Sequence, residues 1–173
     1  MKNTKSLPLT IVATSTKFTT FYYDRLEIDY IKKYSNVLIW DLSFLSSKSF
    51  YKSISAAHYE GSDLKVINSY KKLISEILFV KKNYDIKNIF VMNFVAPNSL
   101  ADLIFLFILK KLGLNTINYD NAGLPTISIS NIERTTSYVL MTLMRRSLNF
   151  ISKILKIYPT HCIYAGNMKK KNM

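Results

Sequence analysis

Short runs of apolar and β-branched residues recur along the chain and predict buried β-strands. The first two are residues 9–14 and 36–41, and the others are residues 87–93, 114–119 and 160–165. Runs of this length between polar residues are typical of strands that are covered on both faces of a sheet. The run 114–119 is more polar than the rest, which indicates a strand nearer to a sheet edge.

Between these runs, apolar residues recur at the three- and four-residue spacing of helices. The spacing predicts four helices, over residues 24–34, 62–78, 100–112 and 131 to about 156. Ser62 or Asp63 is expected to cap the second of them, and Asn98 or Ser99 the third. Residues 43–61 are rich in Ser and Tyr and are expected to form an irregular loop with at most a short helix.

Strands and helices therefore alternate about five times, and no hairpin signal lies between them. Parallel strands need crossover connections, which are usually helices. The pattern predicts an α/β fold: an open, doubly wound, Rossmann-like and mostly parallel sheet of about five strands, with helices on both faces. We expect residues 1–166 of the 173-residue chain to form a single domain and residues 167–173 to form a basic flexible tail.

The chain carries a formal net charge of +13, and its C-terminal quarter is the most basic part. Eight of its 24 Lys and Arg residues follow residue 130, where Glu133 is the only acid. Such charge suits nucleic acid, anionic lipid or phosphorylated substrates, although an AT-rich genome would also enrich a chain in Lys. Nucleic acid is an unlikely partner, because the basic residues are spread over several helices and the aromatic residues lie in apolar runs.

Several chemistries are excluded by what the chain contains. The loop after the first strand, residues 15–23, has no glycine, so it is neither a P-loop nor a dinucleotide-binding fingerprint. One cysteine and two distant histidines exclude an intrachain disulfide and give no metal-ligand spacing, so we expect no metal and no cofactor. No paired carboxylates and no nucleophile–histidine set can be assigned, so no catalytic residue is predicted.

No signal peptide is expected, because polar residues follow the short apolar run near the N-terminus and no small-residue cleavage site is present. The apolar stretch 103–109 is far shorter than the ~20 residues needed to cross a bilayer. We therefore expect a cytoplasmic protein.

Polar residues follow three of the predicted strands at their carboxyl ends, where ligands bind in open α/β sheets. These candidate substrate-binding residues are Thr16, Lys17, Thr19, Asn93, Asn98, Asp120 and Asn121. Hydroxyl and amide groups suit the recognition of a sugar, and Lys17 could serve a phosphate. The competing interpretation is that the same residues cap helices and form turns.

The basic helix has an apolar stripe and a set of cations that lie off it. The stripe consists of Leu140, Leu143, Met144, Leu148, Ile151, Ile154 and Leu155. The candidate membrane-contact residues are Arg145, Arg146, Lys153 and Lys156. A basic amphipathic helix can lie in the interface of an anionic membrane, here the inner face of the cell membrane. Alternatively, the stripe packs on the sheet, as crossover helices do.

The order of these strands and helices and the residue types within them resemble those of a known family. The chain is similar to the amino-terminal domain of bacterial GT-B-fold glycosyltransferases. The similarity lies in two segments after the first strand, 21–25 and 37–42, and in three later segments, 112–113, 119–125 and 160–166. The members meant are those of capsule and O-antigen polysaccharide biosynthesis. Unlike some of them, this chain lacks a glycine-rich first loop near the acceptor.

The resemblance implies a transferase that moves a sugar from a nucleotide sugar to a lipid-linked or surface-polysaccharide acceptor. It also implies that this chain is the acceptor-binding half and that it has hexosyltransferase activity only when joined to a second domain, which holds the nucleotide sugar. Alone it would be truncated and inactive. The alternative, from another class, is a non-enzymatic basic α/β module that binds nucleic acid or another anionic partner.

Overall fold

The computed structural model describes residues 7–48, 52, 58–120, 136–157 and 160–164. Its centre is a six-stranded sheet in the order β3-β2-β1-β4-β5-β6, in which every neighbouring pair is parallel. The strands are β1 (Leu9–Thr14), β2 (Asn36–Asp41), β3 (Leu64–Val66), β4 (Ile89–Phe94), β5 (Asn115–Asp120) and β6 (His161–Tyr164). This architecture confirms the predicted α/β, doubly wound parallel fold.

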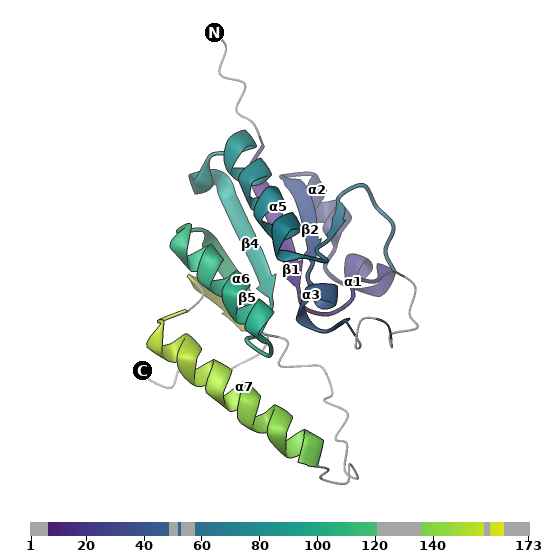
Figure 1. Ribbon diagram of the computed structural model, residues 1–173. Coiled ribbons are helices and arrows are strands. Elements are labelled where there is room, and N and C mark those ends of the chain that lie inside the picture. The colour runs from purple at the N-terminus through teal and green to yellow at the C-terminus, as the bar shows by residue number, and fades with distance from the viewer. Residues whose placement is uncertain (1–6, 49–51, 53–57, 121–135, 158–159, 165–173) are drawn as a thin grey trace.

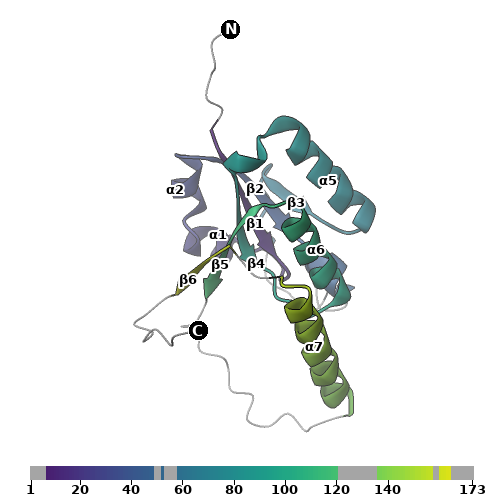
Figure 2. The ribbon, with the colours of Figure 1, turned by 90° about the vertical axis from the view of Figure 1, so that its left-hand side faces the viewer.

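Helices cover both faces of the sheet, as Figure 2 shows with the sheet seen nearly edge-on. Two short helices, α1 (Thr20–Arg25) and α2 (Ile28–Lys32), lie on one face. On the other face lie α5 (Tyr70–Asn83) and α6 (Leu100–Lys111). The remaining helical elements are α3 (Ser43–Ser46), the 3₁₀ turn η1 (Ile86–Asn88) and α7 (Thr136–Ile154).

The prediction of a helix from Ser62 onward is wrong. Residues 64–66 form β3, which pairs with β2 in parallel, and the helix begins only after Ser69, whose hydroxyl accepts a hydrogen bond from the backbone N–H of Lys72 at 3.3 Å. The backbone of β2 holds this segment extended, because Ile39 N donates to Asp63 O and Ile67 N donates to Asp41 O. A strand of three residues is too short to show alternation, so the helical spacing that follows it hid the strand.

The two layers of helices enclose two apolar clusters around the central strand β1, all of whose residues are buried. Leu9 and Ile11 face α5 and α6, where they pack with Trp40 and Phe105. Val12 belongs to the cluster on the α1 and α2 face. Burial on both faces explains why β1 is a continuous apolar run rather than an alternating one.

Helix α7 differs from the other long helices in leaving its apolar stripe mostly uncovered by the described residues. It extends away from the sheet and approaches α6 with its C-terminal part (Figures 1 and 2). Leu148 is buried, with 8% exposed, whereas Leu140 is 69% exposed and Ile154 is 63% exposed. The interpretation that the whole stripe packs on the sheet is therefore wrong for the described chain.

Among the residues that the structure describes, no helix combines the length and the apolar character that a bilayer span requires.

Candidate functional site at the carboxyl edge of the sheet

The strand order places a ligand-binding position between β1 and β4. From β1 the chain moves to β2 and β3 on one side, and it then returns to build β4, β5 and β6 on the other. The carboxyl ends of β1 and β4 are therefore neighbours from which the connections diverge, Thr14 lying opposite Phe94 in the register. Such a switch point is where open α/β sheets bind ligands.

A small cavity of about 130 Å³ lies at this switch point, and we call it the switch-point pocket. It is lined by Thr14, Thr16, Phe18, Tyr22, Arg25, Leu26 and Phe94. Thr14 and Thr16 join their hydroxyl oxygens at 2.9 Å, and the backbone N–H of Thr16 donates to Thr14 Oγ1 at 3.1 Å. These hydrogen bonds form the turn in a loop that has no glycine, and they bring both hydroxyl groups to the wall of the switch-point pocket.

Of the three candidates in this loop, Thr16 lines the pocket, and Lys17 and Thr19 do not. Thr19 holds the N-cap position of α1, but its side chain makes no capping hydrogen bond. Its backbone instead forms an antiparallel bridge with His58. Lys17 is half-buried beside it.

Tyr22 and Arg25 also line the pocket, but the sequence pattern does not indicate them, because they belong to the helix that follows the loop. They lie three residues apart on α1, so both side chains stand on one helix face. The face of α1 that follows a switch-point strand is the signal that could have found them.

A buried carboxylate, Asp41, organises the loops next to this pocket. It ends β2, has no exposed surface, and accepts hydrogen bonds from the backbone N–H groups of Phe18 at 3.0 Å and Ser43 at 2.9 Å. The Ser43 hydroxyl donates to it as well, and Nε2 of His58 lies 2.9 Å from its Oδ2. Asp41 thus ties the segment after β1, which contains Phe18, to two parts of the connection between β2 and β3, at Ser43 and at His58. It also fixes Phe18 in the wall of the switch-point pocket.

The outer side of this region is closed by a polar cluster of Tyr23, Lys32, Tyr59 and Asp63. Lys32 Nζ lies 3.0 Å from Asp63 Oδ2 and donates to the Tyr23 hydroxyl at 2.9 Å. Burial alone would lower the pKa of Lys32, but the hydrogen bonds to Tyr23 and Asp63 raise it above its ordinary value. The rings of Tyr23 and Tyr59 stack at 4.4 Å, which holds Tyr59 edge-on against Phe18.

Asp102 is a second buried carboxyl group near the same edge of the sheet. It lies in the first turn of α6, where its backbone N–H donates to the hydroxyl of Ser99 at 3.1 Å, so Ser99 caps this helix as predicted. Burial raises the pKa of the Asp102 carboxyl, while hydrogen bonds from the Ser46 hydroxyl and from the backbone at Ser99 and Asn98 oppose that shift. Its contact with Ser46 joins α6 to α3 and makes it a structural group.

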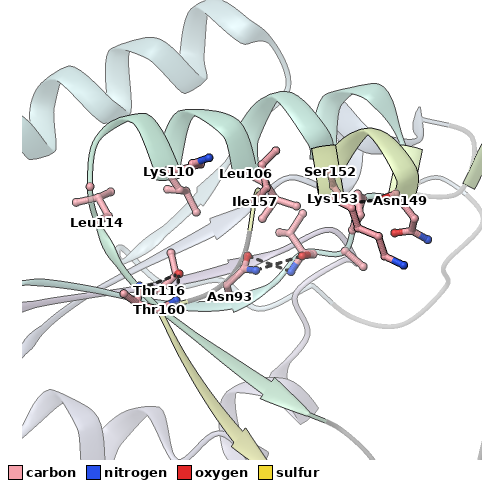
Figure 3. A pocket seen from close by; sticks show the side chains of 15 residues that line it. Asn93, Leu106, Lys110, Leu114, Thr116, Asn149, Ser152, Lys153, Ile157 and Thr160 are labelled. Carbon is pink, nitrogen blue, oxygen red and sulfur yellow. Dashed lines mark hydrogen bonds between the residues drawn. The ribbon is translucent and has the colours of Figure 1, made fainter. Parts of the chain in front are cut away.

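A larger cavity, of about 630 Å³, lies on the α6 side of the sheet, and we call it the interhelix cavity. Its walls come from β4, β5, α6 and the end of α7 (Figure 3). Asn93 is one of its lining residues, and the Asn93 amide closes a loop of its own with the backbone of Val95 at 3.2 and 3.3 Å. Among the candidate membrane-contact residues, Lys153 lines this cavity.

The other predicted residues lie apart from both cavities or outside the description. Asn98 is exposed, and its backbone N–H forms a turn with Ala96 O at 2.7 Å, which favours the turn interpretation. Asp120 ends β5 opposite Tyr164, and Asn121 lies outside the described residues. Arg145, Arg146 and Lys156 are exposed on or just after α7.

Within the described parts of the chain, no group of three or more His, Cys, Asp or Glu side chains could hold a metal ion. The switch-point pocket and the interhelix cavity are the two candidate binding sites of the described residues. Comparison of the chain with protein-family models, with curated proteins and with solved structures finds no match.

Proposed function

We propose that this chain is the acceptor-binding, Rossmann-like half of a glycosyltransferase, which works with a second domain that holds the nucleotide sugar. The observation that carries the proposal is the switch-point pocket. It combines two threonine hydroxyls, the Arg25 side chain and the aromatic ring of Phe18 at the ligand-binding position of a doubly wound sheet.

The chemistry of this pocket suits a sugar ring. A threonine hydroxyl is one donor with two acceptor lone pairs. Thr14 Oγ1 uses all three within the loop, on the backbone N–H, the carbonyl and the hydroxyl of Thr16, so the Thr16 hydroxyl is the one that keeps acceptor capacity for a sugar hydroxyl. Arg25 adds donors, and the rings of Phe18 and Phe94 supply apolar surface for the faces of a pyranose. At about 130 Å³ the pocket fits one small ring rather than a whole nucleotide, and its loop has no glycine that would let the backbone approach a diphosphate.

Sugar binding is tested by saturation-transfer difference NMR with a panel of methyl hexopyranosides and methyl N-acetylhexosaminides. We expect at least one glycoside to bind the unchanged protein and Thr16→Val to weaken it about fivefold to tenfold, as expected for one lost hydrogen bond. Thr20→Val is the matched control, because Thr20 is exposed on α1 and does not line the pocket. No binding of any glycoside, or equal binding by the two variants, would contradict the proposal.

The protein also works at the inner face of the cell membrane, where a lipid-linked acceptor is confined. Support comes from α7, whose apolar stripe is largely uncovered and whose cations Arg145, Arg146 and Lys153 are all exposed, as is Lys156 beyond it. Apolar residues next to cations on one helix are the features that hold a helix in an anionic interface. The exposure of Leu140 and Ile154 leaves these side chains free to enter it.

Vesicle co-sedimentation tests this location. Each cation near an anionic surface contributes about 1 kcal/mol, so changing Arg145, Arg146, Lys153 and Lys156 to Gln is expected to abolish most binding to anionic vesicles at moderate salt. The matched control changes Lys71, Lys72, Lys81 and Lys82 of α5 to Gln, which removes the same charge from another helix. Equal losses in the two quadruple variants would show a general charge effect and would refute a role for α7.

A further inference from the structure

Part of the wall of the interhelix cavity is apolar. Leu106 and Leu109 of α6, Leu114 before β5, Val95 after β4 and Ile157 after α7 all line it. Figure 3 shows Leu106 and Ile157 close together in the middle of the view, and Leu114 at the other end of α6. Its volume of about 630 Å³ lies within the ~300–1,000 Å³ that is usual for small-molecule sites.

The polar groups on the sheet side of the cavity already bind one another. Thr116 N donates to Thr160 Oγ1 at 2.7 Å, and Thr160 N donates to Thr116 Oγ1 at 3.0 Å (Figure 3). The amide of Asn93 is bound to the backbone of Val95. A water molecule needs two to four polar partners, which this wall offers poorly, and engineered apolar cavities of about 150 Å³ stay dry and take up apolar ligands.

The mouth of the cavity is basic. Lys110 and Lys153 line it, and no acidic residue is among the described residues that do so. Lys110 is used internally, because its Nζ donates to the carbonyl of Leu155 and holds the end of α7. Lys153 is exposed, and it stands beside Asn149 on α7 at the outer end of the cavity (Figure 3).

From an apolar interior and a cationic, amide-bearing mouth, we infer that the interhelix cavity binds a single-chain lipid with a phosphate head group. The hydrocarbon chain lies between α6 and the sheet, and the phosphate lies at Lys153 and Asn149. Each methylene group taken out of water strengthens binding about fourfold, whereas the lysine selects a negative head. The inference goes beyond the proposed sugar transfer and concerns a different cavity.

The experiment is calorimetric titration of the full chain with dodecyl phosphate below its micelle concentration. Ser152→Phe fills the cavity from α7 and is expected to weaken binding at least tenfold. Ser147→Phe is the matched control, because Ser147 lies on the same helix, does not line the cavity, and like Ser152 donates its hydroxyl to a helix carbonyl. Equal weakening in both variants would place the lipid on the uncovered stripe and overturn the inference.

Head-group selection is tested with Lys153→Gln against Lys156→Gln, which removes an equal charge outside the cavity. Lys153→Gln is expected to weaken the binding of dodecyl phosphate about threefold to tenfold and to leave the binding of neutral dodecyl maltoside unchanged. Inorganic phosphate alone is expected not to bind at millimolar concentration. Binding of inorganic phosphate as tight as that of dodecyl phosphate, or no binding of the lipid, would overturn the inference.

A measurement without substitutions guards against a variant that fails to fold. In methyl NMR spectra of the unchanged protein, dodecyl phosphate is expected to shift the methyl signals of Leu106, Leu109 and Ile157 and to leave Leu140 in place. The reverse pattern would overturn the inference. Neither result depends on glycoside binding, so this proposal and the sugar-transfer proposal can fail separately.

Discussion

Replacing Asp41 with Ala is expected to lower the free energy of unfolding by about 3–5 kcal/mol, because three buried donors lose their acceptor. These are the backbone N–H groups of Phe18 and Ser43 and the hydroxyl of Ser43. A buried unpaired donor costs about 1–3 kcal/mol, and water cannot reach a group that has no exposed surface. Urea unfolding followed by circular dichroism measures the loss.

Two further variants make the Asp41 result specific. Asp24→Ala removes an exposed acid of α1 and is expected to change stability by no more than about 0.5 kcal/mol. Asp41→Asn keeps one acceptor oxygen and presents an NH₂ group to the remaining donors, so its loss is expected to be intermediate. If Asp41→Ala unfolds at the same urea concentration as Asp24→Ala, Asp41 does not anchor these loops.

Replacing Phe105 with Ala is expected to cost about 3–5 kcal/mol, since it leaves a cavity between α6 and the sheet. Phe105 is fully buried, and its ring meets Trp40 of β2 edge-on, with the ring centroids 6.3 Å apart. The substitution removes the ring contact with Trp40 as well as the apolar surface that the Phe105 side chain buries. Thermal and urea unfolding measure the change.

Phe107→Ala is the matched control for this prediction. It removes the same side chain two residues along α6, where the ring is partly exposed and lies near Lys111. We expect it to cost about 1 kcal/mol. Similar losses in the two variants would mean that α6 does not pack on the sheet through the face that contains Phe105.

The main strands could be predicted because their cause is local. A strand buried on both faces is a continuous apolar run, as in β1 and most of β2. β4 is also an apolar run, although it is fully buried on one face only. The strand β3 could not be found, since its three half-buried residues owe their extended backbone to β2. The position of α7 also depends on tertiary contacts that an amphipathic pattern does not encode.

The site was predictable to the extent that topology alone defines it. The rule that ligands bind at carboxyl strand ends led to Thr16 and Asn93, which do line the two cavities. The contact of Asp41 with His58 was not predictable, because it joins a strand end to a residue 17 positions later across an irregular loop. Asn98 shows the reverse error, since a polar residue at a strand end can simply form a turn.

The central place of β1 in the sheet constrains how the chain can fold as it is synthesised. Leu9 pairs with Asn36 on one side and with Ile89 on the other, so the second partner is made about eighty residues after the first residues of β1. Until β4 has left the ribosome, β1 has an unpaired edge next to apolar side chains that α5 and α6 will later cover. Such edges invite wrong pairing between chains, and distant pairing slows folding. The exposed edge of β1 is therefore paired only after β4 has been synthesised. The nascent chain is most vulnerable to aggregation between the synthesis of β1 and that of β4.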